Sequence, residues 1–488
     1  MIEGFPYEDA LLPKIWLQKL PGFGELTIPK NYPESSSEFS LDFSEEDASA
    51  VRDMEANLDT EESIITSDMI PENDALDNYL GTFDVTGEAG VETLLSPIAV
   101  PDRAVGVIAM HYNAEGENWE QIEDAHIVDG YVYGTVDNFS PIAVFTIRRD
   151  VYIDTSKYCT STSKALICNG IPVYIHLDDE GKPVAEDGYG KVIDMTGVEQ
   201  VIGGTIDGSD LESTSITIDG VDTILSVRAG SFSEDLDNVA HVKKAVVNIS
   251  NVNNNRLGIT GGYFGSITDD YTLNIENSTY SWSGAGESIW QQAPAGKTKE
   301  SGTGDPLSKG RTKKYTLNAK NCTASLVYIS CNCGLTYTDA NEAYVDGCNF
   351  AYFITGGSNG GADRSKNVEI KNSTIGIFQT NNRGYINQVD KVVFTDCKVD
   401  HLFIAGDSTD STVTGITKHI NEIDVLGDSE VVLYVGTQGG TLIASHDELD
   451  ALIDRIIIGR DVKYTFGEDN GASLFGDLIS IFFFYWRR

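Results

Sequence analysis

A chain of 488 residues is too long for one ordinary globular core, so its length predicts two to four domains unless repeated units take up much of it. Its 34 Lys and Arg residues stand against 75 Asp and Glu residues, which gives a formal net charge of −41. Because this charge repels phosphate backbones, nucleic acid is not expected as a partner.

The N-terminal segment, residues 1–47, is apolar and interrupted by prolines, and it contains Leu12, Trp16 and Leu17. Its prolines prevent it from forming a core of its own, yet it is too apolar for a free linker. We therefore predict an arm that docks on a partner protein through these three side chains. The alternative is a strap that lies along the protein's own surface.

Residues 48–80 are acidic and are predicted to form a spacer. The N-terminus shows no basic region, apolar core or cleavage site of a signal peptide, so synthesis in a cytoplasm is expected. The seven cysteines are an odd set without a CxxC pair, which is typical of buried thiols in a reducing compartment. The most apolar run, residues 478–486, has half the length of a membrane helix, so membrane insertion is not expected.

Residues 81–148 alternate short apolar strands with turn residues, which predicts a small β-sandwich-like domain. Its stretch HYNAEGENWEQIEDAHIVDGYVYGTVDNFSPIAVF is similar to a small β-domain of bacterial surface proteins and phage virion proteins. That resemblance implies an extracellular or virion setting and no known catalysis.

A predicted connector, residues 149–190, leads into residues 191–444, which are rich in Asn, Gly, Ser, Thr and β-branched residues. Pairs of small polar residues recur there after short strands. The pairs begin at Asn251, Asn277, Asn321, Gly347, Asn372, Asp396 and Asp428, so the intervals between them are 26, 44, 26, 25, 24 and 32. A repeat of roughly 25 residues with two or three short strands predicts a right-handed parallel β-helix, a solenoid whose coils stack their inward side chains.

One position of each coil carries a small side chain. Cys322, Cys348, Ser373 and Cys397 fall at this position, so we predict that they stack as a ladder inside the solenoid and do not bind a metal. In the strand that follows Ser373, Ile375 and Ile377 are both expected to face the interior.

The longest interval, between Asn277 and Asn321, contains a long insertion, residues 283–314, that is rich in Gly, Ser and basic residues. Insertions in a solenoid often lie on its binding face, and aromatic rings can pack on sugar rings or apolar patches. We predict a ligand-binding role for Trp282, Trp290, Lys297 and Arg311. The alternatives are an inter-subunit loop and a mobile loop.

Residues 445–488 are predicted to form a capping helix and an apolar tail. Ser445 and Glu448 have the spacing of a capping box. The apolar face of the helix would comprise Leu449, Leu452, Ile453, Ile456 and Ile457. The tail contains Phe482, Phe483 and Trp486, and an identical subunit in a homodimer or homotrimer, or another partner, is expected to cover them.

No pattern of catalytic, cofactor-binding or metal-binding residues stands out. Asp269-Asp270 and Asp178-Asp179-Glu180 have the residue types that glycoside hydrolysis needs, but the Gly-His-Gly element of pectinase-like β-helix enzymes is absent. Cys331-Asn332-Cys333 is too short for a zinc site. No catalytic residue, cofactor or metal is assigned, and whether the chain is an enzyme stays open.

The overall plan of apolar arm, small β-domain and β-helix resembles tail-spike and head-fibre proteins of phages, those of crAss-like gut phages among them. The resemblance implies a structural protein at the virion surface that is made in the host cytoplasm. Capsid or tail proteins would then bind the arm, and a host-surface glycan would bind the β-helix. The alternatives are a β-helix polysaccharide depolymerase, either hydrolase or lyase, and a bacterial surface adhesin.

Overall fold

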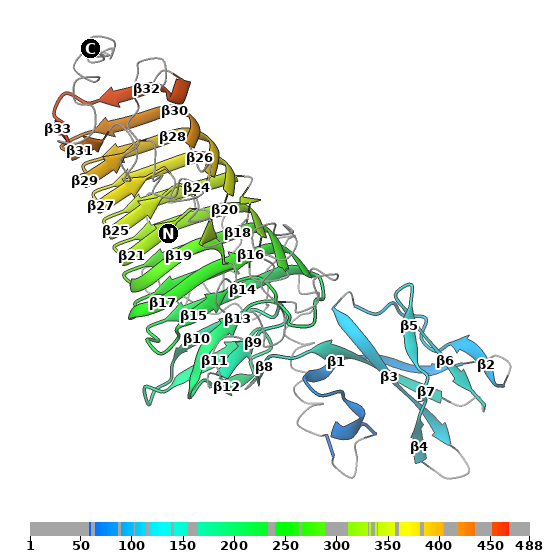
Figure 1. Ribbon diagram of the computed structural model, residues 1–488. Helices are drawn as coiled ribbons and strands as arrows, with labels where there is room; N and C mark the ends of the chain where they lie inside the picture. The colour runs from blue at the N-terminus through cyan, green and yellow to red at the C-terminus, as the bar shows by residue number, and fades with distance from the viewer. Residues whose placement is uncertain are drawn as a thin grey trace, which may run out of the picture.

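Two groups of β-strands make up the structure, which is a computed structural model (Figure 1). The chain is mainly β, and most neighbouring strands of its two largest sheets are parallel. The structure describes residues 58–59, 64–85, 89–101, 103–113, 118–137, 141–154, 164–232, 240–262, 266–287, 311–329, 331–332, 337–338, 340–356, 361–380, 385–404, 417–434 and 451–467.

The first group is a small β-domain with two antiparallel sheets, of strand order β1-β7-β3-β4 and β2-β6-β5. Its strands are β1 (Asp74–Asp84), β2 (Val91–Leu94), β3 (Ala104–Asn113), β4 (Asn118–Gln121), β5 (His126–Val128), β6 (Tyr131–Val136) and β7 (Pro141–Arg149). A core that includes Leu80, Leu95, Ala109, Val132 and Val144 joins the two sheets. Strand β1 begins within the stretch predicted as an acidic spacer, and its Leu80 and Phe83 belong to this core.

The second group consists of two long sheets, here named sheet I and sheet II. Sheet I contains, in spatial order, β12 (Val192–Asp194), β11 (Pro183–Asp187), β10 (Val173–Leu177), β14 (Leu211–Asp219), β16 (Ala240–Ser250), β18 (Ser266–Glu276), β20 (Arg311–Lys320), β24 (Ala340–Asp346), β26 (Gly361–Lys371), β28 (Tyr385–Thr395), β30 (Thr417–Leu426) and β32 (Ile453–Ile458), with β23 (Tyr337–Thr338) beside β26.

Sheet II contains β8 (Tyr152–Asp154), β9 (Lys164–Ile167), β13 (Val198–Ile202), β15 (Ser226–Arg228), β17 (Asn253–Gly262), β19 (Thr279–Glu287), β21 (Thr323–Tyr328), β25 (Asn349–Ile354), β27 (Thr374–Gln379), β29 (Lys398–Phe403), β31 (Glu430–Tyr434) and β33 (Lys463–Phe466), with β22 (Cys331–Asn332) beside β19. Strands β8 to β11 lie within the stretch predicted as a connector.

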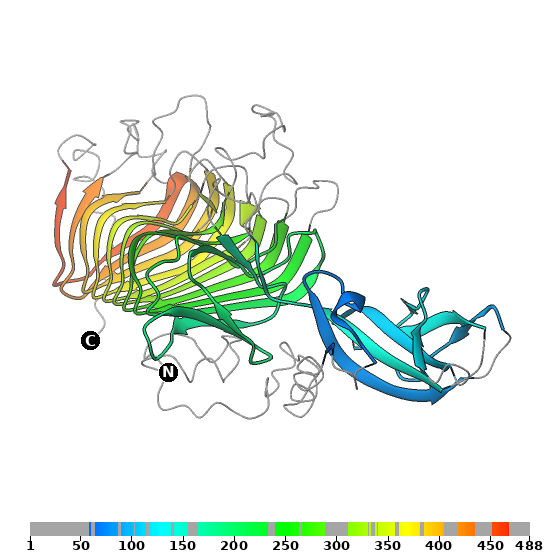
Figure 2. The ribbon, with the colours of Figure 1, turned by 90° about the horizontal axis from the view of Figure 1, so that it is seen from below.

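From β14 onward the chain passes back and forth between the two sheets, with the short strands β22 and β23 as additions to sheet II and sheet I, and neighbouring strands within each sheet are parallel. Each coil therefore adds one strand to each sheet, which is a solenoid arrangement (Figures 1 and 2). One continuous apolar core runs between the sheets from the first coils to Ile456 and Val462. The stacking predicted from the spacing of the repeats is thus observed, because every coil must cover the core of the previous one.

The predicted ladder of small side chains is confirmed. Cys322, Cys348, Ser373 and Cys397 are each at most 3% exposed. The backbone N–H of Cys322 donates to Cys348 Sγ at 3.3 Å, and the N–H of Cys348 donates to Ser373 Oγ at 3.0 Å. These contacts link successive coils, so the small side chains satisfy backbone donors in the interior.

A bend in β19, β21, β25, β27 and β29 of sheet II turns two consecutive side chains outward. The register pairs Phe350 with Ile375 and then Tyr352 with Ile377, so Ala351 and Gly376 are left out of the pairing at the bend. Ile375 is fully buried, as predicted, but Ile377 is partly exposed and Phe378 is buried in its place. The prediction that Ile377 faces the interior is wrong because simple alternation does not continue through a bend.

The predicted C-terminal helix does not continue beyond residue 452, since only 451–452 are helical among its described residues. Ile453, Ile456 and Ile457 lie in strand β32, which pairs in parallel with β30. The free edge of β30 offers backbone partners and a row of buried side chains, and these outweigh the helical spacing of the isoleucines. Residues 445–450 lie outside the described residues.

Candidate binding groove

A groove of about 330 Å³ follows the bend on the outer face of sheet II. One side carries polar groups from successive coils: Thr279, Thr323, Asn349 and Thr374. These four residues are aligned by the parallel register of β19, β21, β25 and β27. Since neighbouring strands lie about 4.8 Å apart, the groove presents a hydroxyl or amide at each such step along the solenoid.

The floor of the groove consists of small residues at the bend. Ser325, Ala351 and Gly376 occupy this position in consecutive coils, and Asp400 occupies it in the next. A Cβ at residue 376 would stand 2.7 Å from the carbonyl oxygen of Ala351, so only glycine fits there without a shift of the backbone. Small side chains keep the groove open to a ligand.

The register aligns a row of larger side chains on the next outward position, which we call the outer ladder. It comprises Trp282, Leu326, Tyr352, Ile377 and His401. Trp282 lies against Gly258 of the preceding coil, where a Cβ would stand 2.6 Å from the indole Nε1. At the other end the His401 ring stacks on Tyr434 with 5.3 Å between centroids. The outer ladder thus flanks the polar groove with rings and apolar side chains.

The arrangement is suited to binding, and the described residues that line the groove include no pair of carboxylates for hydrolysis. Asp400 is the one carboxylate among the described residues that line it, and it forms an ion pair of 2.9 Å with Lys398. Asp269 and Asp270, considered above for catalysis, lie on sheet I and pair with Lys313 and Lys314. Repeated hydroxyl groups beside exposed rings can bind the hydroxyls and apolar faces of a linear polysaccharide.

Of the residues predicted to bind ligand, the structure places Trp282 in the outer ladder. Arg311 begins β20 in sheet I, and its side chain is outside the described set. Trp290 and Lys297 lie outside the described residues, as do the predicted docking residues Leu12, Trp16, Leu17, Phe482, Phe483 and Trp486. These predictions stay predictions.

Sequence reasoning missed the polar side of the groove, although the chain contains a signal for it. Thr279, Thr323 and Thr374 each end an Asn-x-Thr triplet. The middle residue of each triplet, Ser278, Cys322 or Ser373, lies in the ladder of small side chains, which Ser278 extends by one coil. The first residue of each triplet adopts a left-handed conformation, with φ of 48°, 53° and 49° for Asn277, Asn321 and Asn372. Asparagine tolerates this conformation, so the triplet marks a corner followed by an outward hydroxyl.

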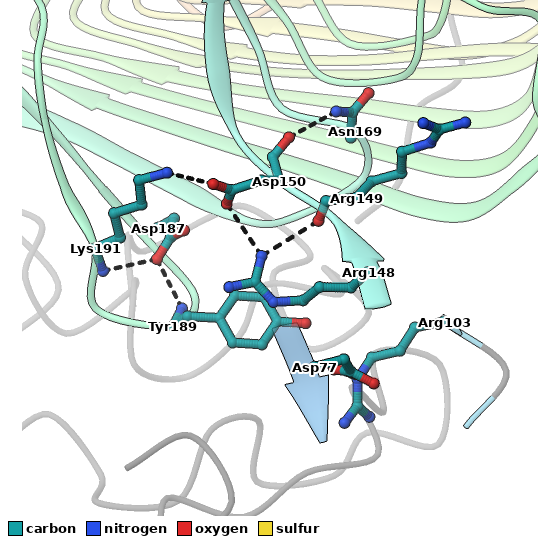
Figure 3. A network of polar contacts seen from close by, with 9 residues as sticks. All are labelled: Asp77, Arg103, Arg148, Arg149, Asp150, Asn169, Asp187, Tyr189 and Lys191. Atoms are coloured by element: carbon teal, nitrogen blue, oxygen red, sulfur yellow. Dashed lines mark hydrogen bonds and ion pairs between the residues drawn. The ribbon is translucent and has the colours of Figure 1, made fainter. Parts of the chain in front are cut away.

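A second polar cluster joins the small β-domain to the first coils (Figure 3). Arg148, at the end of β7, donates to Asp150 Oδ1 at 3.0 Å and lies 3.6 Å from the centroid of the Tyr189 ring. Lys191 forms an ion pair with the same Asp150. Arg148 is 2% exposed, so its charge is balanced by these contacts in the interior and not by water.

Asp187 is the buried acid of this joint. Its Oδ1 accepts the backbone N–H groups of Tyr189 and Lys191, both at 2.9 Å, while its Oδ2 is buried without a hydrogen-bond partner among the described residues. Burial raises the pKa of Asp187 to about 6, against the opposing effects of the Lys191 N–H and the Arg148 charge.

We expect the stability of the joint to depend on pH through Asp187. Because the pKa of Asp187 is raised in the folded state, the folded state holds the proton more tightly than the unfolded state does. The stabilisation by this proton is therefore fully present below about pH 4 and is lost as pH rises through 6. For a pKa shift of this size, the free energy of unfolding falls by about 3 kcal/mol between low and neutral pH. Denaturant unfolding of wild type and Asp187→Asn at pH 4, 5, 6 and 7 measures it. The variant should lack this pH dependence, and parallel curves would contradict the assignment.

Comparison with known protein families, with curated proteins and with solved structures finds no match to this chain. In the described part, no group of three or more His, Cys, Asp or Glu side chains is placed to hold a metal ion. No helix among those same residues is long and apolar enough to cross a membrane.

Proposed function

We propose that this chain is a fibre or spike protein of a phage virion that binds a host-surface glycan along its solenoid. The observation that carries the proposal is the groove on sheet II, where aligned hydroxyl and amide groups lie beside the outer ladder. A linear polysaccharide can contact equivalent groups on consecutive coils, so weak contacts add along the groove. In this proposal the N-terminal arm, residues 1–47, attaches the protein to the capsid or tail.

The proposal includes a right-handed winding of the coils, as in a parallel β-helix. A connection that leaves a strand and returns to a parallel neighbour in the same sheet is right-handed in nearly all proteins. The path from β16 through β17 to β18 is such a connection, and the same path recurs in every later coil. The register of the stacked coils aligns the groove along the axis of the solenoid.

Tyr352→Ala is expected to weaken polysaccharide binding by about tenfold, because a ring that packs on a sugar contributes about 1.5 kcal/mol. Purified protein would first be screened on an array of bacterial capsular and cell-wall glycans, and the affinity for a hit measured by titration calorimetry. Tyr131→Ala is the matched control, since Tyr131 is 39% exposed and Tyr352 36% exposed. Tyr131 lies in β6 of the small β-domain, so its replacement should leave binding unchanged.

Two results would overturn the proposed function. Purified virions that lack the protein by mass spectrometry would exclude the virion assignment, and equal binding by the Tyr352→Ala and Tyr131→Ala variants would exclude the groove. Release of reducing ends or unsaturated sugars from the bound polysaccharide would favour a depolymerase instead.

A further inference from the structure

The described residues that line the groove on sheet II include no basic side chain. Asp400 is the one charged residue among them, and the others carry hydroxyl, amide or apolar groups. Arg256 follows the lining residue Asn255 in the chain but is not itself part of the lining. A ligand in the groove therefore meets hydrogen-bonding and apolar groups, and it meets no cation among these residues.

The polar side of the groove continues to a cation that already has a partner. Lys398 is aligned with Thr374, so it occupies the next position of the row. Its Nζ forms the ion pair of 2.9 Å with Asp400 Oδ1, and the two side chains are 56% and 43% exposed. One positive and one negative charge cancel here, so this end of the groove offers no excess positive charge to an anion.

The charge of the whole chain acts in the same direction. A formal net charge of −41 repels an anionic polymer before it reaches the groove. Inside the groove, a carboxylate, sulfate or phosphate group would lose water without gaining an ion pair, and this loss costs free energy. The hydroxyl groups of a neutral sugar can instead exchange water for hydrogen bonds to side chains such as Thr323 and Asn349.

We infer that the groove selects neutral polysaccharides and discriminates against polymers that carry carboxylate, sulfate or phosphate groups. The inference rests on the proposed function and names the class of glycan that the groove binds. A neutral chain is held by hydrogen bonds to the polar side and by packing of its apolar ring faces on the outer ladder. Neither contact requires a charge on the ligand, so salt has little effect on this binding.

A glycan array sorted by charge gives the first test. The full chain is applied, at low and at physiological ionic strength, to neutral polysaccharides and to polymers that carry uronic acid, sulfate or phosphate groups. The polymers that bind should be neutral, and their affinities should change less than about twofold with salt. Acidic polymers that bind at least as tightly, and lose affinity in Tyr352→Ala, would overturn the inference and leave the proposed function intact. If nothing binds, or Tyr352→Ala weakens no binding, both fail.

Oxidation of a bound neutral polysaccharide at its hydroxymethyl groups adds carboxylates to the same chain and gives the second test. Wild type should bind the neutral form at least about tenfold more tightly than the oxidised form. Asp400→Asn leaves Lys398 without its partner, so this ratio of affinities should fall at least about threefold.

Asp270→Asn is the matched control for Asp400→Asn. Asp270 lies on sheet I, where it pairs with Lys314 at 3.3 Å and its side chain is 36% exposed, so the ratio of affinities should keep its wild-type value. A ratio near one in wild type, or equal ratios in the two variants, would overturn the inference.

Discussion

Phe378→Ala is expected to lower the free energy of unfolding by about 3–5 kcal/mol, the cost of removing a buried ring and leaving a cavity. Phe378 is fully buried in sheet II and contacts Phe353 of the preceding coil, with 5.8 Å between ring centroids. It also packs edge-on against Phe394 of sheet I at 5.0 Å. The ring therefore joins two coils and both sheets, and its loss cannot be repaired by a local shift.

Ile377→Ala is the matched control for this prediction, because Ile377 is the preceding residue in the chain and lies on the outer ladder. Its replacement should cost about 1 kcal/mol or less, since a partly exposed side chain loses little burial. Urea denaturation of wild type and both variants measures the difference. Equal losses for the two variants would mean that the bend at Gly376 does not turn Ile377 outward.

Arg148→Met is expected to destabilise the joint between the small β-domain and the first coils by about 3–5 kcal/mol, because it removes one partner of a buried ion pair. Methionine keeps most of the apolar volume but leaves Asp150 and Asp187 without the Arg148 charge. Hydrogen exchange in β7, β10 and β11, together with denaturant unfolding, would locate and measure the loss.

Lys243→Met serves as the control for the charge itself. Lys243 pairs with Glu212 on the surface, and the two side chains are 64% and 77% exposed. Exposed pairs contribute about 1 kcal/mol or less, so this variant should remain close to wild type. If Arg148→Met were as mild as Lys243→Met, the joint would not depend on the buried charge.

The repeat in the sequence was sufficient to predict the stacked parallel strands and the ladder of small side chains. Equivalent residues of successive coils lie directly above one another, so a small residue such as Cys348 or Ser373 must recur at the interval of one coil. The spacing depends only on the number of residues per coil, which can be counted along the sequence. The resemblance to phage fibre and spike proteins remains a prediction that supports the proposed function.

Of the residues in the groove and the outer ladder, the sequence analysis named only Trp282 as a binding residue, and the reason lies in the register. Tyr352 and Ile377 come together with Trp282 because strands β19, β21, β25 and β27 bend after the same position. A bend of this kind leaves one residue out of the alternation, and no single strand shows it in its sequence. The prediction from simple alternation therefore put Ile377 in the interior, whereas the structure shows it in the outer ladder.

The sequence by itself thus determined the period of the coils and the small residues inside them, since both follow from spacing along the chain. The tertiary structure decided which side chains share a face and which conformation residues Ile453–Ile458 adopt. Ile453 to Ile458 could form a helix or a strand by their own spacing, and the unpaired edge of β30 selects the strand. The joint around Arg148 likewise exists only where β7 meets Tyr189 of the first coils, because its charges are balanced by residues distant in sequence.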